Sequence, residues 1–170
     1  KSVTKGYTLG ITADGDSLRT ARGLLYNRQT RYAEVYYGQI VNQDFYIEAD
    51  TLLSFDSIST YKAYKNIEMI SATDSITIYG DEAIYDKENQ TALAYENAYM
   101  RKMIQGDSLF IKGDTLFSDQ SNPDNKYLTA YNSVEMFKSD MQGVADSVSY
   151  NFTDSTINMF TDPIIWAQDS

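Results

Sequence analysis

Two serines stand in the sequence Gly-Asp-Ser-Leu, which is the nucleophile motif of a group of lipases and esterases. The two copies span Gly15–Leu18 and Gly106–Leu109. A serine nucleophile needs a base that removes its proton, and that base is most often histidine. The chain contains neither His nor Cys, so it lacks this base, a thiol nucleophile and the usual zinc ligands. We interpret both copies as turns that enter strands, and we predict no catalytic residue, no metal site and no cofactor.

Two further columns of residues recur along the chain. The first is acidic and consists of Asp50, Asp81, Asp114 and Asp146, at intervals of 31, 33 and 32 residues. A Ca²⁺ site needs six to eight converging oxygens, so a polar residue at each strand end is the simpler interpretation. The second column is aromatic and consists of Tyr64, Tyr95, Tyr131 and Phe160. These rings could stack on sugars, but we favour a cross-strand ladder, which stabilises a sheet without a ligand.

The acidic column marks a repeat of two strands. Each Asp ends a segment in which apolar or small residues alternate with mixed ones, as in Phe45–Asp50, Ile76–Asp81, Leu109–Asp114 and Met141–Asp146. A second segment follows each of these, as in Ala63–Met69, Ala94–Met100, Ala130–Met136 and the divergent Met159–Ile165. A period of two is typical of half-buried strands. With a weaker unit at about 17–41, we expect about five units and ten strands. A helix would accept the composition of Asp86–Gln105, but its alignment with the repeat favours strand.

Composition and charge narrow the class of protein. Hydrophobic residues make up 42% of the chain and aromatic ones 14%, with 15 Tyr, which favours a folded protein rich in strands. The net charge of −10 has the wrong sign for nucleic-acid binding. No apolar run reaches the roughly 18 residues that a membrane span requires, so we expect a soluble chain. We expect residues 1–170 to form a single domain that is a fragment of a longer protein, because the sequence begins with Lys1.

The apolar positions of the repeat are candidates for a lipid-binding cleft. Met adapts its shape to irregular apolar ligands, but a filled core would use the same residues. We expect Ile47, Ile78 and Ile111 to face Met69, Met100 and Met136 across this cleft. The full set of candidates is Phe45, Ile47, Ile67, Met69, Ile76, Ile78, Met100, Leu109, Ile111, Val134, Met136 and Ile165.

The order of these motifs resembles the OstA/LptA family, through Gly80–Asp86 followed by Tyr95–Ala98 and their counterparts in the other units. Where that family often has Gly before an Asn, this chain has Lys65, Glu96 and Asn132, which suggests a remote branch of the kind found in Bacteroidetes. The resemblance implies an all-β fold, an antiparallel β-jellyroll or folded-over "taco".

The same resemblance implies a function. It predicts a non-enzymatic carrier or scaffold in lipopolysaccharide transport, in the periplasm of a Gram-negative cell and able to associate with the outer membrane. Its partners would be lipopolysaccharide or a related lipid, and transport proteins or further copies joined through open sheet edges. Two alternatives stay open. A structural β-solenoid would have a filled core, and a carbohydrate-binding repeat would show aromatic and carboxylate side chains to solvent.

Overall fold

The chain forms one antiparallel sheet. The computed structural model describes residues 1–12, 15–41, 45–71 and 73–167. Within them, one 3₁₀ turn (Asp56–Ile58) is the only helical segment. The 16 strands are β1 (Ser2–Val3), β2 (Thr8–Ile11), β3 (Ser17–Thr20), β4 (Leu24–Asn27), β5 (Tyr32–Val41), β6 (Phe45–Phe55), β7 (Thr60–Ser71), β8 (Ile76–Asp86), β9 (Thr91–Tyr95), β10 (Tyr99–Ile104), β11 (Asp107–Lys112), β12 (Thr115–Asp119), β13 (Tyr127–Lys138), β14 (Met141–Asn151), β15 (Ile157–Phe160) and β16 (Ile164–Ala167).

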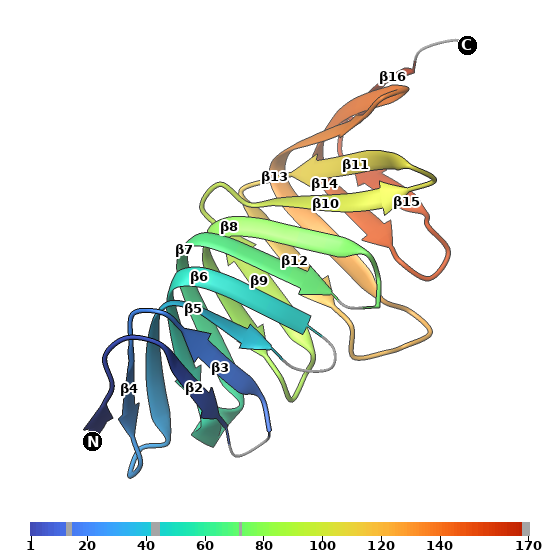
Figure 1. The fold of residues 1–170 in the computed structure, drawn as a ribbon. Helices are drawn as coiled ribbons and strands as arrows, with labels where there is room; N and C mark the ends of the chain where they lie inside the picture. Colours follow the sequence, from blue (N-terminus) through green and yellow to red (C-terminus); the bar gives the residue numbers. More distant parts are fainter. Residues whose placement is uncertain (13–14, 42–44, 72, 168–170) are drawn as a thin grey trace.

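This sheet folds over on itself into two walls, with the strands following one another from the blue end to the red end (Figure 1). Wall A contains β2, β3, β10, β11 and β16, and wall B contains β1, β4, β9, β12 and β15. The long strands β5, β6, β7, β8, β13 and β14 run through both walls. The predicted all-β, folded-over architecture is confirmed, including strands β9 and β10 within Asp86–Gln105. There are more strands than the ten expected, because the corner between the walls interrupts several of them.

Pairs of residues with left-handed backbone make the corner. In β7, Lys65 and Asn66 have φ values of 64° and 52°. Tyr64 pairs with Glu82 of β8, and Ile67 pairs with Gly80. The two residues Lys65 and Asn66 therefore lie opposite the single residue Asp81. Such a β-bulge bends its strand. Positive φ values recur at the equivalent pairs Glu96–Asn97, Asn132–Ser133 and Thr161–Asp162, so the corner continues along the sheet.

Side-chain hydrogen bonds link successive strands at this corner. The Asn66 amide donates to the Asp50 carboxylate at 2.9 Å, and the Asn97 amide donates to the Asp81 carboxylate at 2.8 Å. The Asn97 amide, followed by the backbone N–H of Asn66, holds the pKa of Asp81 below its usual value. Asp50 and Asp81 of the acidic column therefore have a structural role, but they lie at corners inside long strands and not at strand ends as expected.

Where the OstA/LptA family often has Gly before an Asn, this chain has a non-Gly residue with a left-handed backbone. Lys65, Glu96 and Asn132 have φ values of 64°, 59° and 63°, a conformation that costs an L-residue about 1–2 kcal/mol. Asn tolerates it better than most residues do, which explains why Asn is found within three of the pairs. The departures from Gly in the sequence thus fall at the corner itself.

We predict that the left-handed backbone at Asn97 is strained for a residue with an ordinary side chain. Asn97→Ala should lower the free energy of unfolding by about 1 kcal/mol more than Asn97→Gly does, because only Gly accepts a positive φ without strain. Urea unfolding of both variants measures the difference. Equal losses would mean that the left-handed backbone at this corner carries no strain.

Candidate functional site

The interior between the walls gathers the apolar columns of the sequence. Every candidate except one is buried in a single core cluster, namely Phe45, Ile47, Ile67, Met69, Ile76, Ile78, Met100, Leu109, Ile111, Val134 and Met136. The exception is Ile165 in β16, which is 54% exposed at the C-terminal end of the sheet. The structure brings the other candidates together, and their contact with a lipid stays a prediction.

Wall A carries one row of mostly large apolar side chains, interrupted at Gly143. The cross-strand partners in this row are, in order, Leu18, Ile40, Ile47, Met69, Ile78, Met100, Ile111, Met136, Gly143 and Ile165. The expectation that the Ile residues face the Met residues across a cleft is therefore wrong. Consecutive antiparallel strands reverse direction, so both kinds of segment lie on the same side of the corner.

Wall B supplies smaller side chains to the same interior. Its central row contains Leu52, Ala63, Ala83, Ala94, Leu116, Ala130 and Val148, all buried. The search for candidates in the sequence left out this wall. The signal that could have found it is an apolar residue two positions after each Asp, namely Leu52, Ala83, Leu116 and Val148, at which a second alternation begins.

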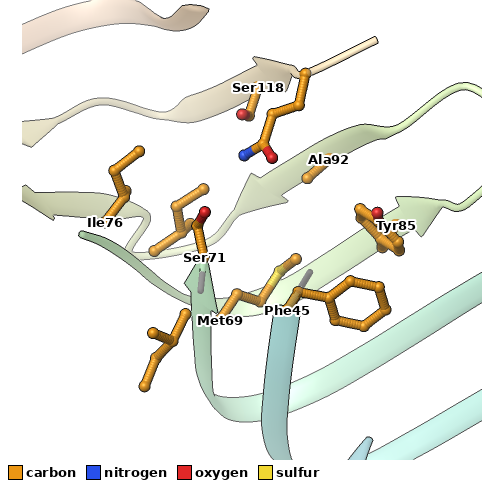
Figure 2. Close-up of a pocket in the computed structure, with 10 residues that line it drawn as sticks. Phe45, Met69, Ser71, Ile76, Tyr85, Ala92 and Ser118 are labelled. Atoms are coloured by element: carbon orange, nitrogen blue, oxygen red, sulfur yellow. The ribbon is translucent and has the colours of Figure 1, made fainter. Parts of the chain in front are cut away.

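The described side chains between the walls pack into one buried cluster. One cavity of about 40 Å³ lies between the walls, lined by Phe45, Met69, Ile76, Ile78, Tyr85 and Ala92 among others (Figure 2). One water molecule occupies about 30 Å³ of liquid, so this space does not hold an alkyl chain. A ligand would enter this interior only if the walls moved apart or side chains rearranged.

Two hydroxyl groups in this interior stand out. The side chains of Ser118 and Tyr150 are 2% and 0% exposed, and neither hydroxyl has a hydrogen-bond partner among the described residues. Ser118 lies on the wall of the cavity (Figure 2). Leaving a buried polar group unpaired costs about 1–3 kcal/mol. A hydrogen bond from each hydroxyl to a polar ligand atom would recover this free energy.

The edge opposite the corner, where the free ends of the two walls meet, is here called the mouth. Near its N-terminal end, Asp16 of wall A pairs with Lys87 of wall B at 2.8 Å. The Tyr61 hydroxyl donates a hydrogen bond to the same carboxylate. Burial, followed by this hydrogen bond, raises the pKa of Tyr61. The Asp16 and Lys87 side chains are 8% and 16% exposed, so this ion pair is largely shielded from solvent.

Further along the mouth, two lysines make cross-wall contacts. Lys126, just before β13, pairs with Asp74, just before β8, at 3.4 Å. Lys102 of β10 donates to the Asp74 carbonyl at 2.6 Å and lies 5.8 Å and 5.7 Å from the ring centres of Tyr150 and Phe152. Burial lowers the pKa of Lys102. Polar contacts thus close the mouth over an apolar interior.

The second Gly-Asp-Ser-Leu copy forms the turn and strand that we expected. Asp107 and Ser108 begin β11. The Asp107 carboxylate accepts hydrogen bonds from the Ser139 hydroxyl and from the backbone N–H of Ser108, which hold its pKa at about 2. In the first copy, the Asp16 carboxylate forms an ion pair with Lys87 and accepts a hydrogen bond from the Tyr61 hydroxyl. In the described ranges, no three Asp, Glu, His or Cys side chains come together as a metal site would require.

The aromatic column does not form the predicted cross-strand ladder. Tyr64, Tyr95, Tyr131 and Phe160 lie on the outer face of wall B, and Glu82, Thr115 and Ser147 on the strands between separate them. The ladder prediction is wrong because equivalent residues recur on every second strand. The rings that do stack are Tyr79 and Tyr99 of wall A, with centres 4.6 Å apart.

Comparisons with known proteins bear on the fold. No protein-family model matches the chain, and no curated protein sequence matches it. Among solved structures, the chain is similar to LptH from Pseudomonas aeruginosa, described as the LptA-homologous periplasmic component of the conserved lipopolysaccharide transport device. The alignment covers 75% of this chain and 96% of LptH, with a TM-score of 0.65 and 12% identity. The two proteins share a fold. The resemblance read from the sequence is thereby confirmed for the architecture.

Among the residues described, no helix has the length and apolar character needed to cross a bilayer.

We predict that Met100 stabilises the packed interior. Met100→Ala should lower the free energy of unfolding by about 2–4 kcal/mol, because Met100 is fully buried and its loss leaves a cavity. Met103→Ala, on the outer face of the same strand and 49% exposed, should change it by less than about 0.5 kcal/mol. Equal losses in urea unfolding would contradict a packed interior.

Proposed function

We propose that the protein is a non-enzymatic carrier or scaffold that binds lipopolysaccharide or a related lipid between its two walls. The observation that carries this proposal is the row of apolar side chains along wall A, from Leu18 in β3 to Ile165 in β16. An alkyl chain that lay along it would gain about 0.8 kcal/mol for each methylene removed from water. The fold shared with LptH, described as a periplasmic component of a lipopolysaccharide transport device, supports a role in such transport in the periplasm.

The packing of the interior favours one competing function. A structural β-solenoid needs only a filled core, and a cavity of about 40 Å³ fits that role. The carrier proposal requires in addition that the core can rearrange. Buried Met69, Met100 and Met136 support this, because Met side chains adapt to new neighbours at low cost.

Photo-methionine distinguishes the two functions. The chain has six Met, and a diazirine analogue at all of them changes side-chain volume little. After illumination with lipopolysaccharide, we expect lipid adducts at Met69, Met100 and Met136. Met103, 49% exposed on the outer face, is the internal control. Adducts at Met103 alone, or none at the three buried positions under saturating lipid, would favour the structural solenoid.

We propose further that the C-terminal edge of the sheet pairs with a strand of a partner protein, which extends the sheet. Among the described residues, β15 and β16 pair with β14 alone, which leaves their outer edges unpaired. Ile164, Ile165 and Trp166 in β16 are 53%, 54% and 55% exposed. An open edge with apolar side chains is suited to strand addition. The partner would be a second copy or a transport protein of the same fold.

Trp166 reports on this edge because it is the chain's one tryptophan. We predict that its emission shifts to shorter wavelength as protein concentration rises, since assembly removes the indole from water. Ile165→Glu should prevent the shift while leaving the free energy of unfolding within about 0.5 kcal/mol, because Ile165 is exposed. A constant emission maximum, with a strict monomer in sedimentation, would contradict self-assembly.

A further inference from the structure

The mouth contains an opening beside its Asp74–Lys126 pair. The apolar cavity between the walls adjoins a second hollow of about 340 Å³, and Tyr85 and Gln120 line both. This outer hollow is also lined by Thr73, Gln90 and Lys126. The space therefore changes from polar at the surface to apolar inside. That gradient suits an amphiphile, with its head group in the outer hollow and its alkyl chain entering the inner cavity as the walls move apart.

Polar groups at this opening could bind such a ligand. Lys126 places an ammonium group on the wall of the outer hollow, where an anionic head group would lie. The unpartnered Ser118 hydroxyl, 2% exposed, lies on the wall of the inner cavity (Figure 2). A buried hydroxyl without a partner in a mostly apolar pocket is an independent sign that a polar atom, such as an ester or hydroxyl oxygen next to an alkyl chain, belongs there.

The two ion pairs differ in how easily they separate. Asp16 and Lys87 lie 2.8 Å apart with side chains 8% and 16% exposed, and Tyr61 shares the carboxylate. Asp74 and Lys126 lie 3.4 Å apart with side chains 15% and 22% exposed. A longer and more exposed pair is screened more by water. The Asp74–Lys126 pair is the weaker closure.

Both members of the weaker pair would keep a partner after it separates. The Asp74 carboxylate also accepts hydrogen bonds from the hydroxyls of Ser71 and Thr73, each at 3.1 Å. Lys126 would exchange this carboxylate for the anionic head group. Neither charge is then left unpaired, which is the main penalty for breaking an ion pair.

We propose that this opening is a lateral binding site for an amphiphile with an anionic head group, and that the Asp74–Lys126 pair is the clasp that opens to admit it. The alkyl chain passes sideways between the walls here, and the Asp16–Lys87 pair keeps the N-terminal part of the mouth closed. The inference rests on the proposed lipid-binding function and adds the route by which a lipid reaches the interior.

A reversible cross-wall bridge tests this route, and the chain's lack of Cys makes it simple to install. The double variant Asp74→Cys/Lys126→Cys is compared with itself before and after bridging by a short bismaleimide. The probe is purified lipopolysaccharide, and the readout is the initial rate at which it displaces an apolar dye. We expect bridging to lower this rate at least tenfold. Bridging Lys138→Cys/Asp140→Cys, which joins two residues at one hairpin of wall A, should leave the rate unchanged.

The outcomes separate the route from the function. Equal rates before and after bridging at positions 74 and 126 would overturn lateral uptake, while the lipid-binding function would stand. Failure of the unaltered protein to displace dye with lipopolysaccharide would overturn both. A second comparison uses lipid A with and without its phosphates. The form without phosphates should enter at least threefold more slowly, because it has no anionic group to pair with Lys126. An equal rate would overturn the role of Lys126.

Discussion

The fold depends on a left-handed corner that recurs in every second strand. An antiparallel sheet with one apolar face has to cover that face, and here it does so by folding onto itself. The bend needs residues such as Lys65 and Asn66 at positive φ, which costs free energy at each site. The hydrogen bonds from Asn66 to Asp50 and from Asn97 to Asp81 hold the corner together from strand to strand. The apolar surface buried between the walls offsets the remaining free-energy cost of the left-handed residues.

The corner also decides what the interior can do. Because one sheet supplies both walls, the interior stays closed at the corner, and the mouth is the long side at which the walls can separate. The mouth is held by polar contacts and not by apolar packing alone, and three of its lysines are Lys87, Lys102 and Lys126. In a chain with 24 acidic and 14 basic residues, this local placement matters, since an anionic lipid would be repelled by the net charge. Lys87 and Lys126 are each paired with a carboxylate, so an anionic head group gains from their charge only where such a pair separates.

Much of this arrangement could be predicted from the sequence, because a period of two identifies strands and their inward faces without knowledge of their neighbours. Burial of Met69, Met100 and Met136 follows from that period. Which wall each residue occupies does not, because it depends on the bend at Lys65–Asn66 and on the bulge opposite Asp81. The ion pairs between the two walls could not be predicted from the sequence either. Asp16 and Lys87 lie 71 positions apart in the sequence, and their contact at 2.8 Å exists only once the sheet is folded over.

The central claim is that a packed interior opens to hold lipid between the walls, and the distance between the walls tests it most directly. Spin labels on the outer faces, at Arg101→Cys in wall A and Leu93→Cys in wall B, report that distance by pulsed electron paramagnetic resonance. Both positions are exposed. A pair within wall A, at Glu48→Cys and Glu135→Cys, serves as the reference. Under saturating lipopolysaccharide, we predict a longer distance between 93 and 101 and an unchanged distance between 48 and 135. An unchanged distance across the walls while lipid is bound would contradict the claim.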